Sequence, residues 1–377
     1  MTQAFSQTPA LPATHPLMLD DAERSTAESA LIQGYRGQVG VRRPVWFMRQ
    51  AGRSLPEYRK LREGTTMLES CLIPEMASEI TLQPVRRHDV DAAIFFSDIV
   101  IPLKLAGIGV EIQPGVGPVL DAPIRSAEDV DKLPELTDDM FEPITEAVKL
   151  TVAELGSRPL IGFAGAPYTV AAYMVEGRPS RDHLGPRTMM HNDPKAWDRL
   201  MAWTAEASGR FLRAQIMAGA SAAQLFDSWA GSLSRTNYET KVMPYSKQAI
   251  SHISDLTGPT GIPLVHFGTG TSEILDLIRD TGASVVGVDY RLRLDEVNRR
   301  LANTPGPDGR TTVPLQGNID PALLSAQWDV LEAHVRDVIA QGAEAPGHVL
   351  NLGHGVPPTT DPTVLTRVVE LIHSIDY

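Results

Sequence analysis

The sequence is short of the residues that build several common kinds of site. Its 377 residues include one cysteine, Cys71, so an internal disulfide and a metal site made of several cysteines are both excluded. No apolar run approaches the roughly 20 residues needed to span a bilayer. Cations are the minority among the charges, and the formal net charge is -12. This balance argues against non-specific binding of nucleic acid and gives no sign of a membrane partner.

The first part of the chain is rich in Ser, Thr, Pro and Ala. It lacks both the basic start and the apolar centre of a secretory signal. We therefore expect residues 1–28 to form a flexible N-terminal tail on a cytoplasmic protein. Residues 29–377 are expected to form one domain, because no linker, low-complexity tract or clear repeat follows residue 40. Such a length is common for an α/β barrel that folds as a single unit.

Short apolar runs recur along the chain and alternate with segments of helical periodicity, a pattern typical of parallel strands covered by helices. Eight runs predict a single-domain (β/α)8 TIM barrel, with the active-site cleft at the carboxyl ends of the strands. The Pro-Gly-Val-Gly-Pro turn within residues 109–124 predicts an inserted hairpin. The predicted strands are residues 45–48, 92–96, 160–163, 222–226, 263–267, 284–288, 313–315 and 349–352. The predicted helices include residues 143–155, 195–218, 243–256, 272–280, 294–302, 328–341 and 363–375.

The most distinctive segment is PVWFMRQAGR, at residues 44–53. It belongs to a block, residues 42–62, that holds seven cations and one acid in an otherwise acidic chain. A planar guanidinium binds carboxylate or phosphate through two parallel hydrogen bonds. The block therefore predicts a pocket for a multiply negative ligand, and the plain alternative is a solvated basic turn around Arg49 and Arg53.

Other polar residues follow the predicted strands. Asp98 follows the second strand, Tyr173 the third and Ser228 the fourth, and His354 lies between two glycines after the last. Each has a structural alternative: a helix N-cap for Asp98, the core for Tyr173, a loop hydrogen bond for Ser228 and a satisfied loop position for His354. The glycines beside His354 would let the backbone approach a ligand closely. Three further acids are interpreted as structural caps: Asp227, Asp289 and Asp320.

Taken together, six motifs resemble the uroporphyrinogen decarboxylase family of haem biosynthesis. They occur in order and cover nearly all of residues 30–377, which makes the resemblance specific. The motifs are PVWFMRQAGRSLPEYR (44–59), FSDI (96–99), GFAGAPYTVAAYMVEG (162–177), QLFDSWAG (224–231), LQGNIDP (315–321) and NLGHG (351–355).

The resemblance implies a homodimeric barrel that converts uroporphyrinogen III into coproporphyrinogen III. The reaction removes the carboxyl group of each of four acetate side chains as CO2, and the family uses no metal and no organic cofactor. Carried over by position, Asp98 and Arg49 are the catalytic candidates. The implied substrate-binding residues are Arg49, Gln50, Ala51, Gly52, Arg53, Asp98, Tyr173, Ser228 and His354.

The chemistry of that substrate suits these residue types. Carboxylates around its rim need cations, and its pyrrole N–H groups need one acceptor, which the two oxygens of an ionised Asp98 could supply. We expect Asp98 to stabilise positive charge on the ring, and Arg49, or a water that it holds, to deliver a proton or polarise a carboxylate. An arginine close to Asp98 should keep that carboxylate ionised.

Two other functions compete with this interpretation. One is a zinc- and corrinoid-dependent methyltransferase of the same barrel superfamily, but zinc needs three or four ligands and no His or Cys stands within a few residues of Cys71. The other is a non-catalytic porphyrin-binding protein, which would have no need for Asp98 and Arg49 together. Metal analysis and CO2 release discriminate between the three.

Overall fold

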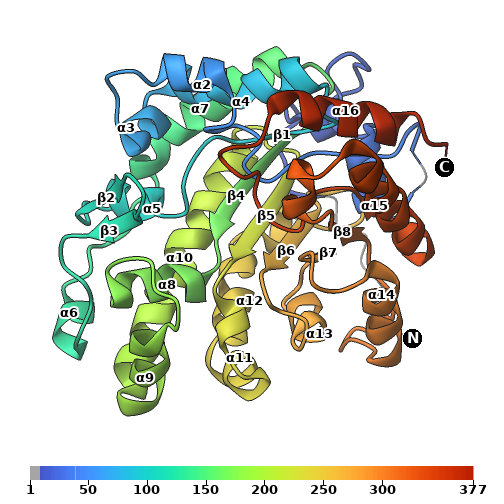
Figure 1. Cartoon of the computed structure of the whole chain (residues 1–377). Helices are drawn as coiled ribbons and strands as arrows, with labels where there is room; N and C mark the ends of the chain where they lie inside the picture. The colour runs from blue at the N-terminus through green and yellow to red at the C-terminus, as the bar shows by residue number, and fades with distance from the viewer. Residues whose placement is uncertain (1–8, 39, 377) are drawn as a thin grey trace.

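A parallel sheet lies at the centre of the molecule with helices around it (Figure 1). The computed structural model describes residues 9–38 and 40–376. The seven-stranded sheet has the order β1-β4-β5-β6-β7-β8-β9, and every neighbouring pair is parallel. Its strands are β1 (Ala93–Ile94), β4 (Leu160–Gly165), β5 (Ala222–Asp227), β6 (Leu264–Gly268), β7 (Val285–Gly287), β8 (Leu315–Gln316) and β9 (His348–Val349).

The strands at the middle of the sheet are buried on both faces. Every residue of β4 and β6 is buried, which explains why their sequences are continuous apolar runs instead of alternating ones. At the ends of the sheet, Val45 forms a parallel bridge with Leu350, just beyond β9. The carbonyl of Val45 also accepts a hydrogen bond from the Asp91 amide, just before β1, at 2.8 Å. Val45 thus lies between the first and last strands of the sheet.

The predicted strand at residues 45–48 is wrong in its extent, since its only ladder contact among the described residues is the bridge at Val45. Two side-chain amides take the place of a partner strand. Gln50 Oε1 accepts from the Phe47 amide at 2.9 Å, and Asn351 Oδ1 accepts from the Met48 amide at 3.0 Å. The segment therefore turns away from the sheet after its first residues.

The predicted hairpin is confirmed. β2 (Val110–Gln113) and β3 (Gly117–Leu120) pair antiparallel from Val110 with Leu120 to Gln113 with Gly117. Gly115 and Gly117 adopt φ values of 77° and 114°, which side chains disfavour, so the turn needs glycine there. The Leu120 amide donates to the Gly177 carbonyl at 2.8 Å.

Helices cover the sheet, and the longest, α10, shows why they form. Asp193 caps it by accepting from the Ala196 amide, Pro194 occupies its first turn, and most of its apolar side chains are buried. The last helix begins in the same way, with Asp361 as N-cap and Pro362 at the first position. The helices are α1 (Ala30–Tyr35), α2 (Pro56–Leu61), α3 (Met67–Leu72), α4 (Pro74–His88), α5 (Ile101–Leu105), α6 (Ala127–Asp131), α7 (Glu142–Leu155), α8 (Pro167–Glu176), α9 (Leu184–Asn192), α10 (Pro194–Met217), α11 (Arg235–Lys241), α12 (Met243–Ser251), α13 (Leu275–Arg279), α14 (Leu294–Asn303), α15 (Trp328–Gln341) and α16 (Pro362–His373).

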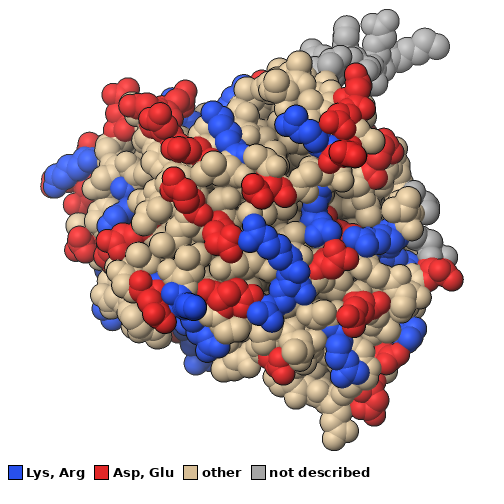
Figure 2. Space-filling view, turned by 90° about the horizontal axis from the view of Figure 1, so that it is seen from above, with Lys and Arg blue, Asp and Glu red and all other residues tan. Residues whose placement is uncertain are grey.

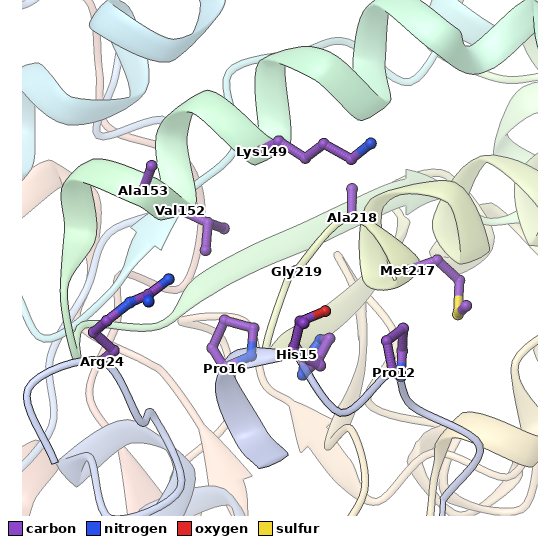
Figure 3. A pocket seen from close by; sticks show the side chains of 11 residues that line it. Pro12, His15, Pro16, Arg24, Lys149, Val152, Ala153, Met217, Ala218 and Gly219 are labelled. Atoms are coloured by element: carbon purple, nitrogen blue, oxygen red, sulfur yellow. The ribbon is translucent and has the colours of Figure 1, made fainter. Parts of the chain in front are cut away.

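Part of the predicted tail packs against the body of the protein. The ring of buried His15 contacts the Ala220 carbonyl at 3.2 Å, and Thr26 Oγ1 donates to Ser221 Oγ at 2.8 Å. A cavity of about 240 Å³ lies where this segment meets α7 and the residues after α10 (Figure 3). Residues 1–8 lie outside the described part of the chain, and the division at residue 28 stays a prediction.

The surface carries both signs of charge. On the face seen in Figure 2, basic side chains lie among acidic ones over the whole view. In the described part of the chain, no helix combines the length and the apolar character that crossing a membrane requires.

Candidate active site

The Arg49 turn is held by the segment that follows β9. The Val356 amide donates to the Met48 carbonyl at 2.8 Å, and Asn351 binds the Met48 amide from the other side. Arg49 itself has φ 61°, a left-handed conformation that is uncommon outside glycine. Its side chain passes over Gly355 so closely that a Cβ there would lie 2.6 Å from Arg49 Cδ. The exposed guanidinium is therefore set in place beside the His354 loop.

The remaining residues of the predicted arginine segment differ in exposure. Gln50 is fully buried, and its amide donates to the Ala92 carbonyl at 3.0 Å, so both of its polar atoms bind backbone. Ala51 and Gly52 are partly exposed, and Arg53 is exposed. The Gln50 side chain therefore stabilises the turn through its backbone hydrogen bonds, while the Arg53 side chain is open to solvent.

Asp98 lies just beyond β1, half-buried, within electrostatic reach of Arg49. Burial raises the pKa of its carboxyl above the ordinary value, and the Val100 amide and the positive charge of Arg49 act in the opposite direction. The Val100 amide donates to Asp98 Oδ1 at 3.0 Å. Desolvation is therefore the larger effect, and the positive charge of Arg49 offsets it only in part. A ligand that donates N–H bonds to this carboxylate would offset the desolvation.

Tyr173, on α8, lies near both of these charges. Burial, together with the smaller effect of the negative charge of Asp98, raises its pKa to about 12, and Arg49 acts in the opposite direction. The phenol is therefore neutral and can donate a hydrogen bond at physiological pH. Its ring stacks on Trp229 with centroids 3.9 Å apart, and Trp229 in turn packs on His183 at 4.2 Å. Two other rings from separate segments, those of Trp229 and His183, thus help to fix the position of Tyr173.

His354 lies at the exposed edge of the group. The protein around its ring lowers its pKa, and the positive charges of Arg49 and Arg291 lower it further. The Gly355 amide donates to His354 Nδ1 at 2.8 Å. Since Nδ1 accepts, the neutral ring carries its proton on Nε2, where it can be donated to a ligand.

The structure brings together four of the predicted residues, because Arg49 lies within electrostatic reach of Asp98, Tyr173 and His354. Ser228 joins them indirectly, through its neighbour Trp229.

Comparison with known proteins identifies the family. The uroporphyrinogen decarboxylase family model matches residues 26–375. A uroporphyrinogen decarboxylase of Arthrobacter sp. (strain FB24) is 72% identical over 350 residues, which cover 93% of this chain and 98% of the relative. One from Leifsonia xyli subsp. xyli (strain CTCB07) is 58% identical, with 97% of this chain and 98% of the relative covered. The chain belongs to the uroporphyrinogen decarboxylase family.

Solved structures of other proteins share the fold. A methyltransferase from Methanosarcina mazei aligns with a TM-score of 0.74 at 16% identity, covering 92% of this chain and 98% of that one. A B12-independent methionine synthase from Shewanella sp. W3-18-1 aligns with a TM-score of 0.52 at 10% identity, covering 79% and 87% of the two chains. At identities this low, the likeness shows only that this decarboxylase-family chain shares their fold.

Sequence reasoning missed two of the rings. Trp229 stands next to Ser228 in the family motif DSWAG, so the motif could have pointed to it. His183 had no signal, because it lies in a loop outside the motifs and reaches Trp229 only through the fold. Of the three acids interpreted as caps, Asp320 does cap a short 3-10 helix by accepting from the Ala322 amide at 2.9 Å, whereas Asp227 contacts side chains instead.

Proposed function

We propose that this chain is a uroporphyrinogen decarboxylase of porphyrin and haem biosynthesis, converting uroporphyrinogen III into coproporphyrinogen III and CO2. The observation that carries the proposal is the grouping of Arg49 with Asp98, Tyr173 and His354. Close identity to decarboxylases of the family over nearly the whole chain supports it.

Substrate binding divides between the centre and the rim of the macrocycle. The Asp98 carboxylate accepts hydrogen bonds from the pyrrole N–H groups, which replaces the water that burial removed from it. The guanidinium groups of Arg49 and Arg53 bind carboxylates at the rim. His354 donates through Nε2, Ser228 binds through its hydroxyl, and the turn formed by Gln50, Ala51 and Gly52 keeps the two arginines apart.

Loss of CO2 needs a place for the electrons of the broken bond. Protonation of the pyrrole carbon next to the reacting arm makes the ring a cation, and the C–C bond then breaks with its electron pair passing into the ring. The methylene group left behind takes up a proton to become a methyl group, and the ring releases the one that it held. One proton is consumed for each CO2, and the pyrrole serves as the electron sink.

Asp98 and Arg49 have opposite electrostatic tasks in this step. The fixed negative charge of Asp98 stabilises the cationic ring, an effect that is often the largest in catalysis. Arg49 is a poor acid because its pKa exceeds roughly 12; it polarises the departing carboxylate or holds the water that delivers the proton. Tyr173, held by the stacked rings, positions the reacting arm.

We further infer a single (β/α)8 barrel domain at residues 29–377, acting as a cytoplasmic homodimer without metal or organic cofactor. The barrel is supported by the segment at Val45: its carbonyl accepts from the Asp91 amide beside β1, and the flanking Pro44 and Trp46 bond to Leu350 beside β9. Inside, the Gln316 amide donates to Gln224 Oε1 at 3.0 Å, which links β8 to β5. Gel filtration with light scattering tests the dimer.

The experiment that tests the function is anaerobic incubation with uroporphyrinogen III, followed by measurement of CO2 and chromatography of the products. The proposal predicts four CO2 for each coproporphyrinogen III. Binding of the porphyrinogen without CO2 would support the carrier instead. Methyl transfer that depends on stoichiometric zinc in the purified protein would support the methyltransferase.

A further inference from the structure

Two titratable side chains lie buried beneath the loop that carries Ser228. Asp227 is the last residue of β5 and His266 lies on the neighbouring strand β6, and both side chains are fully buried. Asp227 Oδ2 and His266 Nε2 are 3.5 Å apart. Within the described chain, neither of these two atoms has a hydrogen-bond partner at normal distance. The reaction described above makes no use of this pair.

The hydrogen bonds on the histidine side fix one proton. Thr281 Oγ1 lies 2.6 Å from the Ile278 carbonyl and 3.1 Å from His266 Nδ1. A hydroxyl has one proton, and the shorter contact, to a carbonyl that can only accept, takes it. His266 Nδ1 must then be the donor to Thr281, which makes Nδ1 protonated.

The aspartate side is fixed in the same way. Thr169 Oγ1 donates to Asp227 Oδ1 at 2.8 Å and accepts from the Trp229 amide at 3.2 Å. The hydroxyl proton of Thr169 is thereby used, and Asp227 Oδ2 has no hydrogen-bond partner in the described chain, with His266 Nε2 3.5 Å away. A neutral ring protonated at Nδ1 would point a bare Nε2 at an ionised carboxylate, so two lone pairs would oppose each other in a buried space. One additional proton between Oδ2 and Nε2 removes this conflict.

We propose that Asp227 and His266 share one proton, and that this pair, neutral overall, positions the Ser228–Trp229 segment of the candidate active site. Asp227 and His266 are positioning residues, since neither belongs to the group around Arg49. Two phenols lie within reach of the Asp227 charge, those of Tyr168 and Tyr238, and burial raises the pKa of both. The shared proton therefore supplies the charge balance.

The path from this pair to the site is short. Asp227 holds Thr169, and Thr169 holds the Trp229 amide. The Trp229 ring stacks on Tyr173, with centroids 3.9 Å apart. Just after β6, Thr269 Oγ1 donates to the Ser228 carbonyl at 2.6 Å. The residues that follow β5 are thus held by Thr169 and by Thr269. A change in the Asp227–His266 pair would therefore move Ser228 and Tyr173 together.

Nitrogen NMR of the intact protein labelled with ¹⁵N-histidine tests the proton directly and does not depend on the proposed activity. The His266 signals are assigned by their loss in His266→Leu. We expect Nδ1 of His266 to be protonated at neutral pH. A bare Nδ1, or a bare Nε2 that shows no hydrogen bond, would overturn the shared proton.

Two substitutions of Asp227 test the positioning role, and this part rests on the proposed decarboxylation. In Asp227→Asn, the amide oxygen can accept from Thr169 while the amide N–H donates to bare Nε2, so the arrangement survives. In Asp227→Ala it is lost, and kcat/KM should fall roughly 10- to 100-fold, the range for a misplaced binding group. We expect Asp227→Asn to restore most of this loss, and Trp229 fluorescence to shift in the alanine variant alone.

The outcomes of these experiments distinguish the shared proton, the positioning role and the proposed function from one another. An Asp227→Asn variant that loses as much activity as Asp227→Ala would contradict the shared proton, because Asn would then face a donor at Nε2. Wild-type kinetics in a folded Asp227→Ala protein would overturn the positioning role. A wild-type protein that releases no CO2 would defeat the proposed function, while the NMR result would stand by itself.

Discussion

Replacing Asp98 by Asn removes a negative charge from the proposed centre of the site and little else. The amide oxygen of Asn can still accept from the Val100 amide, which lies 3.0 Å from Asp98 Oδ1. The side chain keeps nearly the same shape, so the backbone beyond β1 has no reason to move. Any loss of turnover in Asp98→Asn therefore reports on charge.

The size of the loss follows from the charge that Asp98 would oppose. Two unit charges about 4 Å apart, at an effective dielectric constant of about 20, attract by about 4 kcal/mol. Removal of one preorganised electrostatic group typically costs about 100- to 1,000-fold in kcat. We expect Asp98→Asn to lose kcat in this range when CO2 release is followed under anaerobic conditions.

The stability of the folded protein should not fall in Asp98→Asn, although its turnover does. Burial raises the pKa of Asp98, so the folded protein binds this proton more tightly than the unfolded chain. That contribution to stability is present at low pH and is lost as pH rises from the unfolded pKa through the folded one. At pH 7 the wild type carries the cost of a desolvated carboxylate, and Asp98→Asn does not. Its free energy of unfolding should equal or exceed that of the wild type.

The pH profile gives a second check. The wild-type kcat/KM should fall as acid protonates Asp98, at a pH above the ordinary range for aspartate, and the small residual activity of Asp98→Asn should lack this limb. Asp361→Asn is the matched control, because it makes the same chemical change at a helix N-cap where Asn serves equally well. Turnover of Asp98→Asn within about threefold of that control would refute the electrostatic role.

Three further substitutions test the rim of the site by steady-state kinetics. Arg49→Gln should raise KM about 10- to 100-fold through loss of a charged hydrogen bond, whereas Arg59→Gln, an equal change at an exposed position, should not; equal effects would count against the binding role. Gly355→Ala should lower kcat/KM because its Cβ would lie 2.6 Å from Arg49 Cδ, and unchanged kinetics in the folded variant would mean that Arg49 need not hold its place. His354→Asn should lower kcat about tenfold or less, as loss of one neutral hydrogen bond does; complete inactivity would make His354 an acid–base group instead.

Much of the sheet could be predicted because its strands are buried on both faces. The continuous apolar runs that contain β4, β5 and β6 are typical of parallel strands covered by helices on both faces. Prediction failed where side chains replace strand partners. The Phe96 amide bonds to Thr81 Oγ1 at 2.9 Å, so β1 ends at Ile94, short of the predicted residue 96. No local pattern reveals a contact with a residue so far away.

The site divides in a similar way. Arg49, Asp98 and His354 could be named because the predicted barrel would place its chemistry beyond the strands and the family motifs fall there. The direction in which the pKa of Asp98 shifts could not be predicted, because it depends on how much protein surrounds the carboxyl group. His183 could not be found either, because only the fold brings it to Trp229.

A crystal structure of the complex with coproporphyrinogen III, prepared under anaerobic conditions, tests the central claim most directly. The account predicts that the Asp98 carboxylate lies about 3 Å from pyrrole nitrogens, at hydrogen-bond distance, while Arg49 contacts carboxylates at the rim of the same ligand. A macrocycle that touches only one of these two residues, or turns its nitrogens away from Asp98, would contradict it.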